Sequence, residues 1–235
     1  MQGGFLIAGY RLVKPVERPQ WMDGSLPDVI LSASGCICDT VPDSWAYDWS
    51  GAKWADRAKS AATLGVIGRE LRGMAAWCAD AFSRGLIVYP EVFKDIRWAR
   101  EFARRFGVDR NCLCLIGLGF SEGLQPDLLH ETREIERRKG ANRELKGLVE
   151  ERRGMEPGGE ILGFEVLGLD LGTFHSWLCN GLEKPVLKDL GIRTGRYGLI
   201  AEEGEAEQVA AYCNRDDVAS EPVCWHPFLL VKYDW

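Results

Sequence analysis

The sequence predicts a single domain of the α/β or α+β class over residues 1–235, with a mixed central β-sheet covered by helices. Nearly half of the residues are hydrophobic (46%), which is enough to build a sizeable core. An amphipathic segment at 91–106 precedes a continuous apolar run at 112–118. This order of a helix and a buried strand is typical of folds that combine helices with a central sheet.

Five segments are predicted to form the strands of this sheet. Residues 4–13 are an apolar run that Pro15 closes, and residues 29–38 are a second run that Gly35 interrupts. The run at 112–118 is bounded by turn residues, as expected for a strand that is buried on both faces. The last two strands are predicted at 161–169 and 224–233.

Three helices, at 66–84, 91–106 and 205–214, are predicted to cover the sheet. Their apolar residues recur at intervals of three and four, which is the spacing of a buried helical stripe, and Gly107 is suited to end the second helix. Residues 127–153 carry nearly balanced opposite charges three or four positions apart, which favours a solvated helix.

The charge and the apolar runs exclude two classes of partner. A net charge of -6 argues against a nucleic-acid binder, which needs a basic surface to neutralise phosphates, but it permits a basic protein partner. The longest apolar run, Cys112–Phe120, is too short to span a bilayer, and the N-terminal residues do not have the pattern of a signal peptide. The sequence therefore predicts a cytoplasmic protein with no nucleic-acid and no membrane partner.

The eight cysteines are predicted to be reduced thiols, because most of them lie in apolar patterns of a chain without an export signal. Two pairs, Cys36/Cys38 and Cys112/Cys114, are two residues apart, which places both thiols on one face of a strand. Structural zinc sites instead favour a Cys-x₂₋₄-Cys spacing on a turn. We therefore expect no metal and no cofactor, with a zinc site at these pairs as the alternative.

The residues His175 and Cys179 are candidates for nucleophilic chemistry. They are four apart, which places them on one face of a short helix predicted from Thr173 to Asn180. A Cys–His pair of this kind can supply a nucleophile and its base in a hydrolase or transferase. The neighbouring aromatic residue Trp177 supports a competing interpretation, in which this helix packs into the core.

An aromatic and acidic segment at 39–54 is the strongest candidate for a binding surface. Large aromatic side chains beside acids in a loop suit a protein interface, with the rings as anchors and the charges around them. In the competing interpretation the tryptophans close the core and the acids cap turns. The predicted partner-binding residues are Asp43, Trp45, Tyr47, Asp48 and Trp49.

Residues 160–233 resemble the C-terminal part of small bacterial proteins that are associated with toxin immunity. The segments that carry the resemblance are Phe174–Glu183, Tyr197–Ile200 and Glu221–Tyr233. The resemblance implies an acidic, cytoplasmic, single-domain protein that neutralises a cognate effector by stoichiometric binding. It implies no site residue, because the binding surfaces of such proteins differ from pair to pair.

The function predicted first is therefore a non-enzymatic immunity-type protein. It neutralises a cognate bacterial toxin by direct binding through its acidic, aromatic surface, and under this interpretation no residue is catalytic. The alternative is a small cytoplasmic hydrolase or transferase that uses His175 and Cys179.

Overall fold

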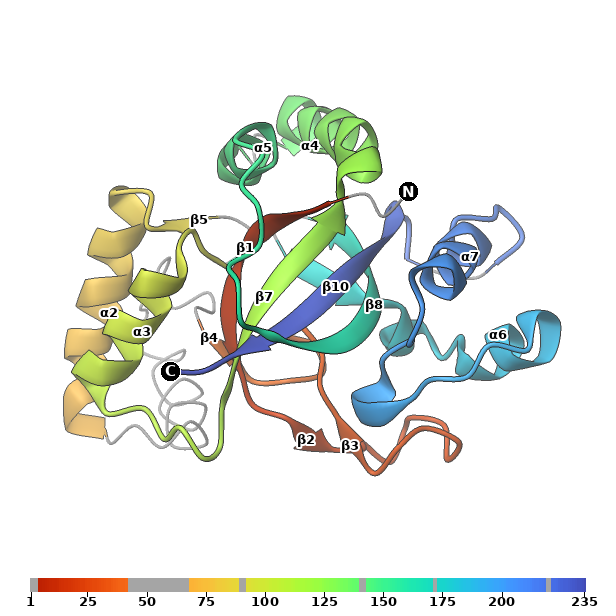
Figure 1. Ribbon diagram of the computed structural model, residues 1–235, viewed down its shortest axis with the longest axis horizontal. Coiled ribbons are helices and arrows are strands. Elements are labelled where there is room, and N and C mark those ends of the chain that lie inside the picture. Colours follow the sequence, from red (N-terminus) through yellow and green to blue (C-terminus); the bar gives the residue numbers. More distant parts are fainter. Residues whose placement is uncertain (1–3, 42–67, 89–91, 140–142, 171–172, 219–220) are drawn as a thin grey trace.

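The computed structural model describes residues 4–41, 68–88, 92–139, 143–170, 173–218 and 221–235, and all structural statements concern these residues. One curled antiparallel sheet forms the centre of the molecule, and helices surround it (Figure 1). Its strands follow the order β5-β6-β1-β7-β10-β8-β9, and β4 pairs with β1 as well. The bounds of the strands are β1 Phe5–Val13, β4 Thr40–Val41, β5 Ile87–Val88, β6 Val92–Phe93, β7 Cys114–Ser121, β8 Glu160–Asp170, β9 Thr173–Ser176 and β10 Trp225–Tyr233.

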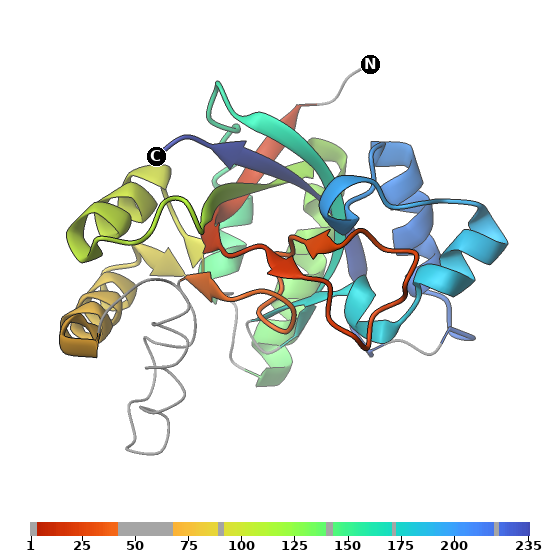
Figure 2. The same cartoon turned by 90° about the horizontal axis from the view of Figure 1, so that it is seen from below.

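Two short strands, β2 (Val16–Glu17) and β3 (Val29–Ile30), pair with each other outside the main sheet (Figure 2). The helices form three groups in Figure 1: α2 with α3, α4 with α5, and α6 with α7. Their bounds are α2 Gly68–Ser83, α3 Ile96–Phe106, α4 Gln125–Lys139, α5 Arg143–Glu150, α6 Glu183–Leu190 and α7 Glu203–Cys213, and the short 3-10 helices are η2 Glu122–Leu124, η3 Trp177–Asn180 and η4 Arg196–Gly198. None of the helices in the described ranges is long and apolar enough to cross a membrane.

Helix α3 illustrates how local sequence positions an element against the sheet. The Asp95 side chain accepts a hydrogen bond from the backbone N–H of Arg97 and caps the first turn, and Gly107 ends the helix with a left-handed backbone (φ 60°). Its buried stripe includes Phe102, whose ring centroid lies 5.3 Å from that of Trp77 on α2. The two helices therefore share one aromatic core layer at the β5–β6 side of the sheet.

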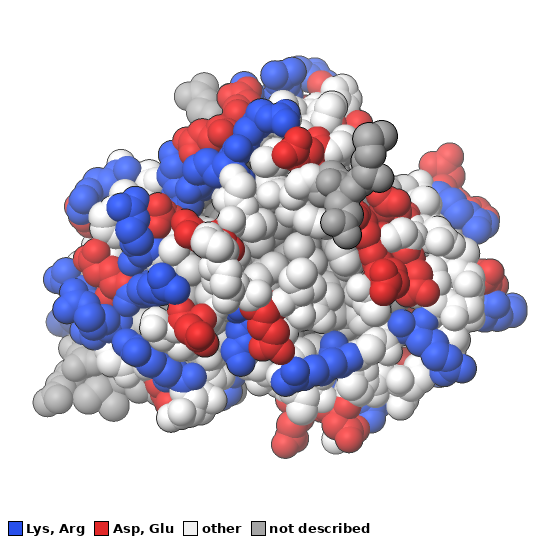
Figure 3. Space-filling view, viewed as in Figure 1, with Lys and Arg blue, Asp and Glu red and all other residues white. Residues whose placement is uncertain are grey.

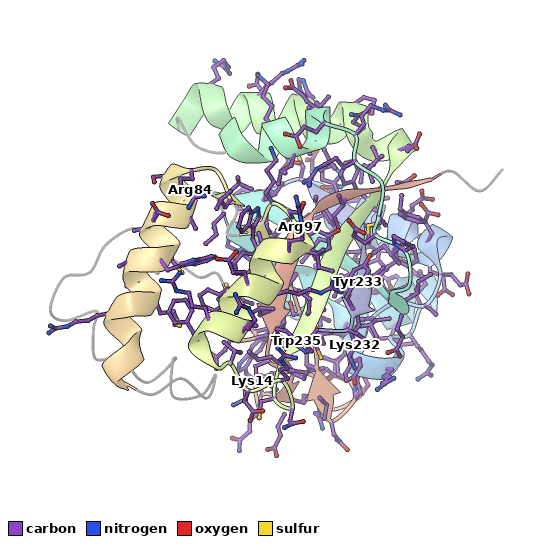
Figure 4. The ribbon with its side chains drawn as sticks, turned by 60° about the vertical axis from the view of Figure 1, so that its left-hand side comes forward. Lys14, Arg84, Arg97, Lys232, Tyr233 and Trp235 are labelled. Carbon is purple, nitrogen blue, oxygen red and sulfur yellow. The ribbon has the colours of Figure 1, made fainter. Side chains whose placement is uncertain are left out.

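Strand β7 is the central strand, paired on one side with β1 and on the other with β10. A side chain at Gly117 would meet the ring of Tyr233 at 2.9 Å, so the glycine lets this ring cover β7. The C-terminal end of β10 is held by α3, because the Arg100 guanidinium donates two hydrogen bonds to the Asp234 carbonyl (3.2 and 2.8 Å). Figure 4 shows Tyr233 and Trp235 at this end, beside α3.

The two faces of β10 have different surroundings. Leu229 and Val231 line a shallow apolar hollow together with Ile161, which is 69% exposed. Figure 3 shows the uncharged area at the centre of this outer face, ringed by charged side chains. Phe228 points to the opposite, inner face and contacts Phe174 of β9 at 5.6 Å between centroids. The site described below lies at the inner face.

The predicted fold class is confirmed, with helices around one sheet, and the predicted strands at 4–13, 161–169 and 224–233 and helix at 205–214 match observed elements closely. The prediction of a mixed sheet is wrong for the described strands, because every strand pair is antiparallel. The predicted strand at 112–118 is observed as β7, two residues later. Cys112 lies in an exposed turn, where its thiol donates to the Asp109 carboxylate (3.1 Å).

Three further predictions differ at the level of single elements. The helix predicted at 91–106 begins only at Ile96, because Phe93 pairs with Tyr10 in the sheet. The strand predicted at 29–38 ends at Ile30 and continues as a loop. The short helix predicted over 173–180 is strand β9 followed by η3, because residues 173–176 pair with β8.

A candidate thiol site

Three segments that are distant in the sequence bring two thiols, an imidazole and a carboxylate together. The loop at 31–38 contributes Cys36, and β9 with η3 contributes His175 and Cys179. Glu221, before β10, contributes the carboxylate that contacts His175. We refer to Cys36, His175, Cys179 and Glu221 as the thiol site.

Two buried polar side chains on the inner face of the sheet, Arg11 and Glu165, hold the 31–38 loop in place. Glu165 of β8 is 1% exposed and accepts hydrogen bonds from the Ser32 hydroxyl and from the Ala33 backbone N–H (2.8 Å). Arg11 of β1 is fully buried, donates to the Ala33 carbonyl and lies 5.3 Å from the centre of the Phe174 ring. Strands β7 and β10 separate β1 from β8, so the curl of the sheet allows both strands to reach the same loop.

The Arg11 charge and the hydrogen bonds favour an ionised Glu165, but burial outweighs them and raises the pKa of this carboxyl group. The Ser32 hydroxyl and the backbone of Ala33 thus form hydrogen bonds with side chains of the sheet, and not with the backbone of a neighbouring strand. This explains why residues 31–38 form a loop even though their composition resembles a strand.

A tight turn within the loop gives its two cysteines opposite surroundings. The backbone N–H groups of Ile37 and Cys38 both donate to the Ser34 carbonyl, at 3.2 and 3.1 Å. Cys38 is buried and its sulfur accepts from the Ser32 N–H (3.3 Å), which closes the loop from inside. Cys36 is exposed on the outer side of the turn. The prediction that Cys36 and Cys38 share one face is wrong, because it assumed an extended strand.

The segment β9–η3 positions His175 and Cys179 next to this turn. His175 lies opposite Gly168 of β8 in the strand pairing. The Ser176 side chain then accepts from the Leu178 N–H (3.3 Å) and begins η3, which Gly181 ends with a left-handed backbone. The change from strand to 3-10 helix places Cys179 one turn away from His175, on the side that faces Cys36.

The two thiols of the site interact directly, and this changes the acidity of both. The Cys179 thiol lies close enough to the Cys36 sulfur to act as a hydrogen-bond donor, and this interaction lowers the pKa of Cys36 from 9.0 to about 6. A hydrogen bond with Ser34 and the positive charge that His175 can carry act in the same direction, against the effect of burial. The same contact raises the pKa of Cys179. At neutral pH Cys36 is therefore mainly a thiolate, the nucleophilic form, whereas Cys179 keeps its proton.

The imidazole of His175 is held beside a carboxylate. Its Nδ1 atom lies 2.9 Å from Oε2 of Glu221, although the two are not aligned for a good hydrogen bond. Asn180 fixes Glu221, because its side-chain carbonyl accepts from the Glu221 N–H (3.0 Å). The His175 side chain is 18% exposed, which leaves it accessible to a small substrate.

The site has the parts needed for thiol nucleophilic chemistry. These parts are an exposed thiolate, a hydrogen-bonding thiol and an imidazole paired with a carboxylate. In the described part of the chain, no group of three histidine, cysteine or acidic side chains is arranged to hold a metal ion.

Sequence reasoning identified part of this site. It singled out His175 and Cys179, which the structure brings together, but it treated Cys36 only as a reduced thiol that shares a strand face with Cys38, and it gave Glu221 no role in a site. The available signal for Cys36 was Gly35, which favours a turn over a strand. The predicted partner-binding residues Asp43, Trp45, Tyr47, Asp48 and Trp49 lie outside the described residues.

Comparisons with known proteins found no matching family model, no matching curated protein and no matching solved structure. The resemblance of residues 160–233 to immunity proteins therefore stays a prediction.

Proposed function

We propose that the protein is a thiol-dependent hydrolase or acyltransferase with Cys36 as its nucleophile and His175 as its acid and base. The observation that carries this proposal is the contact of the exposed Cys36 sulfur with the Cys179 thiol, beside the His175–Glu221 pair. A cysteine with a lowered pKa that is also accessible is the usual setting of a reactive thiol, whereas structural cysteines are buried and keep high pKa values.

The residues have separate roles in the proposed reaction. The Cys36 thiolate attacks the carbonyl carbon of an ester or thioester, a C–S bond forms, and the bond to the leaving group breaks as that group takes a proton from the His175 imidazolium. The neutral imidazole then removes a proton from water, or from another acceptor, which attacks the acyl group on Cys36 and releases the thiolate. Glu221 is a positioning residue that orients His175.

The test uses p-nitrophenyl acetate and mass spectrometry. The wild-type protein is expected to release a burst of p-nitrophenol with acetylation of Cys36, followed by slower turnover. Cys36→Ser is expected to abolish the burst. His175→Ala is expected to retain acetylation but to lower turnover by about 100-fold, the usual contribution of an acid–base group.

A matched control is available on the same chain. Cys112 is also exposed, but its contact with Asp109 raises the pKa of its thiol, so Cys112→Ser is expected to behave as the wild type. An unchanged burst and turnover in Cys36→Ser would contradict the proposal. Thermal melts of all variants show whether any loss of activity comes from unfolding.

Toxin neutralisation is our second proposal. The resemblance of residues 160–233 and the net charge of -6 support it, since an acidic surface suits a basic effector. A pull-down with the product of the neighbouring gene is expected to give a stoichiometric complex that Trp45→Ala and Trp49→Ala weaken, with melting temperatures unchanged. A complex that forms equally well with Cys36→Ser would assign the binding to a surface other than the thiol site.

A further inference from the structure

All eight cysteines carry free thiols, and Cys36 and Cys179 are distinguished by their interaction with each other. Cys36 is exposed on the outer side of its turn, whereas Cys179 in η3 is only partly exposed. Ser34 interacts with both thiols, so its hydroxyl and the two sulfurs form one cluster. An accessible thiolate with a second thiol beside it is the usual arrangement of a cysteine pair that is oxidised to a disulfide.

Short, irregular backbone carries both of these cysteines. Cys36 follows Gly35 in the tight turn of the 31–38 loop, and Cys179 lies in η3, a 3-10 helix that ends at Gly181. Neither cysteine belongs to a strand, so a local movement of the turn or of the helix end leaves the pairing of the central sheet intact. The fold therefore allows the two sulfurs to form a bond without unfolding of the sheet.

Two other cysteines show which properties set Cys36 apart. Cys38 is buried, and burial raises the pKa of its thiol to about 12. Cys112 is exposed, but its contact with Asp109 raises the pKa of its thiol. Hydroperoxides oxidise the thiolate rather than the thiol, so neither residue is set up to react with them. Cys36 combines the exposure that Cys38 lacks with the ionisation that Cys112 lacks.

We propose that the thiol site also reduces hydroperoxides, with Cys36 as the attacking thiol and Cys179 as the resolving thiol. The Cys36 thiolate attacks the outer oxygen of the hydroperoxide, the O–O bond breaks, and the alkoxide takes a proton from solvent and leaves as an alcohol. Cys36 is thereby oxidised to a sulfenic acid. The Cys179 sulfur then attacks the Cys36 sulfur, an S–S bond forms, and the hydroxide that leaves takes the Cys179 proton and becomes water.

The two thiols are thus oxidised to a disulfide by two electrons, and the hydroperoxide is reduced to an alcohol and water. A dithiol reductant, such as dithiothreitol, returns both thiols by exchange and permits a further cycle. This activity uses the same Cys36 thiolate as the proposed acyl transfer, but it does not depend on an acyl substrate. The disulfide also occupies the nucleophile, so it is expected to stop acyl transfer until it is reduced.

The test treats the fully reduced protein with equimolar hydrogen peroxide at about pH 8, where Cys36 is expected to be partly ionised even when Cys179 is absent. Mass spectrometry of the unreduced peptides is expected to show an intramolecular Cys36–Cys179 disulfide, with fragmentation distinguishing Cys36 from Cys38. In Cys179→Ala the sulfenic acid cannot be resolved, so dimedone is expected to label Cys36. With dithiothreitol present, the wild type is expected to consume hydrogen peroxide at least about tenfold faster than Cys36→Ser.

Cys112→Ser is the matched control, and it is expected to form the disulfide as the wild type does. Thermal melts of Cys36→Ser and Cys179→Ala show whether a loss of reactivity comes from unfolding. The proposal would be overturned if Cys36 and Cys179 stayed reduced, if only intermolecular disulfides formed, or if Cys112 were oxidised as readily as Cys36. A disulfide in a protein that gives no burst with p-nitrophenyl acetate would support this activity and contradict acyl transfer, and a burst without the disulfide would do the reverse.

Discussion

The Glu165→Ala protein is expected to lose about 3–5 kcal/mol of unfolding free energy, a large part of the stability of a typical domain. The substitution removes the acceptor of the Ser32 hydroxyl and of the Ala33 N–H, and it removes a carboxyl group that interacts electrostatically with the buried Arg11 guanidinium. Chemical denaturation followed by tryptophan fluorescence measures the loss.

Glu165→Gln is the matched variant, because an amide oxygen can still accept from Ser32 and Ala33. It is expected to cost clearly less than Glu165→Ala. The 31–38 loop is also expected to loosen in Glu165→Ala, which hydrogen exchange of the Ser34 to Cys38 amides detects. A Glu165→Ala protein as stable as the wild type would show that the hydrogen bonds to Glu165 do not hold this loop.

The second large effect is expected for the reactivity of Cys36 in a Cys179→Ala protein. Alkylation by iodoacetamide requires the thiolate, so in the wild type the rate is expected to rise with pH through about 6, the pKa of Cys36, and then to level off. Without the Cys179 thiol, the main cause of the lowered pKa is lost and the midpoint moves to higher pH. At pH 6.5 the rate is expected to fall by about tenfold or more.

Peptide mapping restricts this measurement to the modified Cys36. The control is Cys224→Ala, which removes an exposed thiol whose pKa is raised by burial and is expected to leave the Cys36 profile unchanged. If Cys179→Ala left the midpoint near 6, the Ser34 hydroxyl and the His175 charge would have to be the main causes.

The sequence predicted an element well where the residues that determine the element lie close together in the chain. Helix α3 has its N-cap, its buried stripe and its C-terminal glycine together between Asp95 and Gly107, so periodicity located it even though β6 shortened its start. The loop at 31–38 depends on Glu165, which is 133 residues away from Ser32. Its apolar composition predicted a strand. The sequence near the loop does not indicate that Glu165 accepts hydrogen bonds from Ser32 and Ala33.

The candidate site was predictable only in part for the same reason. His175 and Cys179 are close in sequence, so their spacing drew attention to them. Glu221 joins them through the pairing of β8 with β9 and with β10, and Cys36 joins them through the hydrogen bonds of the 31–38 loop to Arg11 and Glu165. Both are long-range information. The acidity of Cys36 also depends on the Cys179 thiol, and no single segment contains both.

The strand order β1-β7-β10 has a consequence for the synthesis of the protein. The first strand pairs with β7, and β7 pairs with the last strand, each across more than a hundred residues of chain. Strand β10 also lies between β7 and β8 and pairs with both of them. A nascent chain in which β10 has not yet been synthesised would therefore present two open strand edges, on β7 and on β8, which favours slow folding and recruits chaperones.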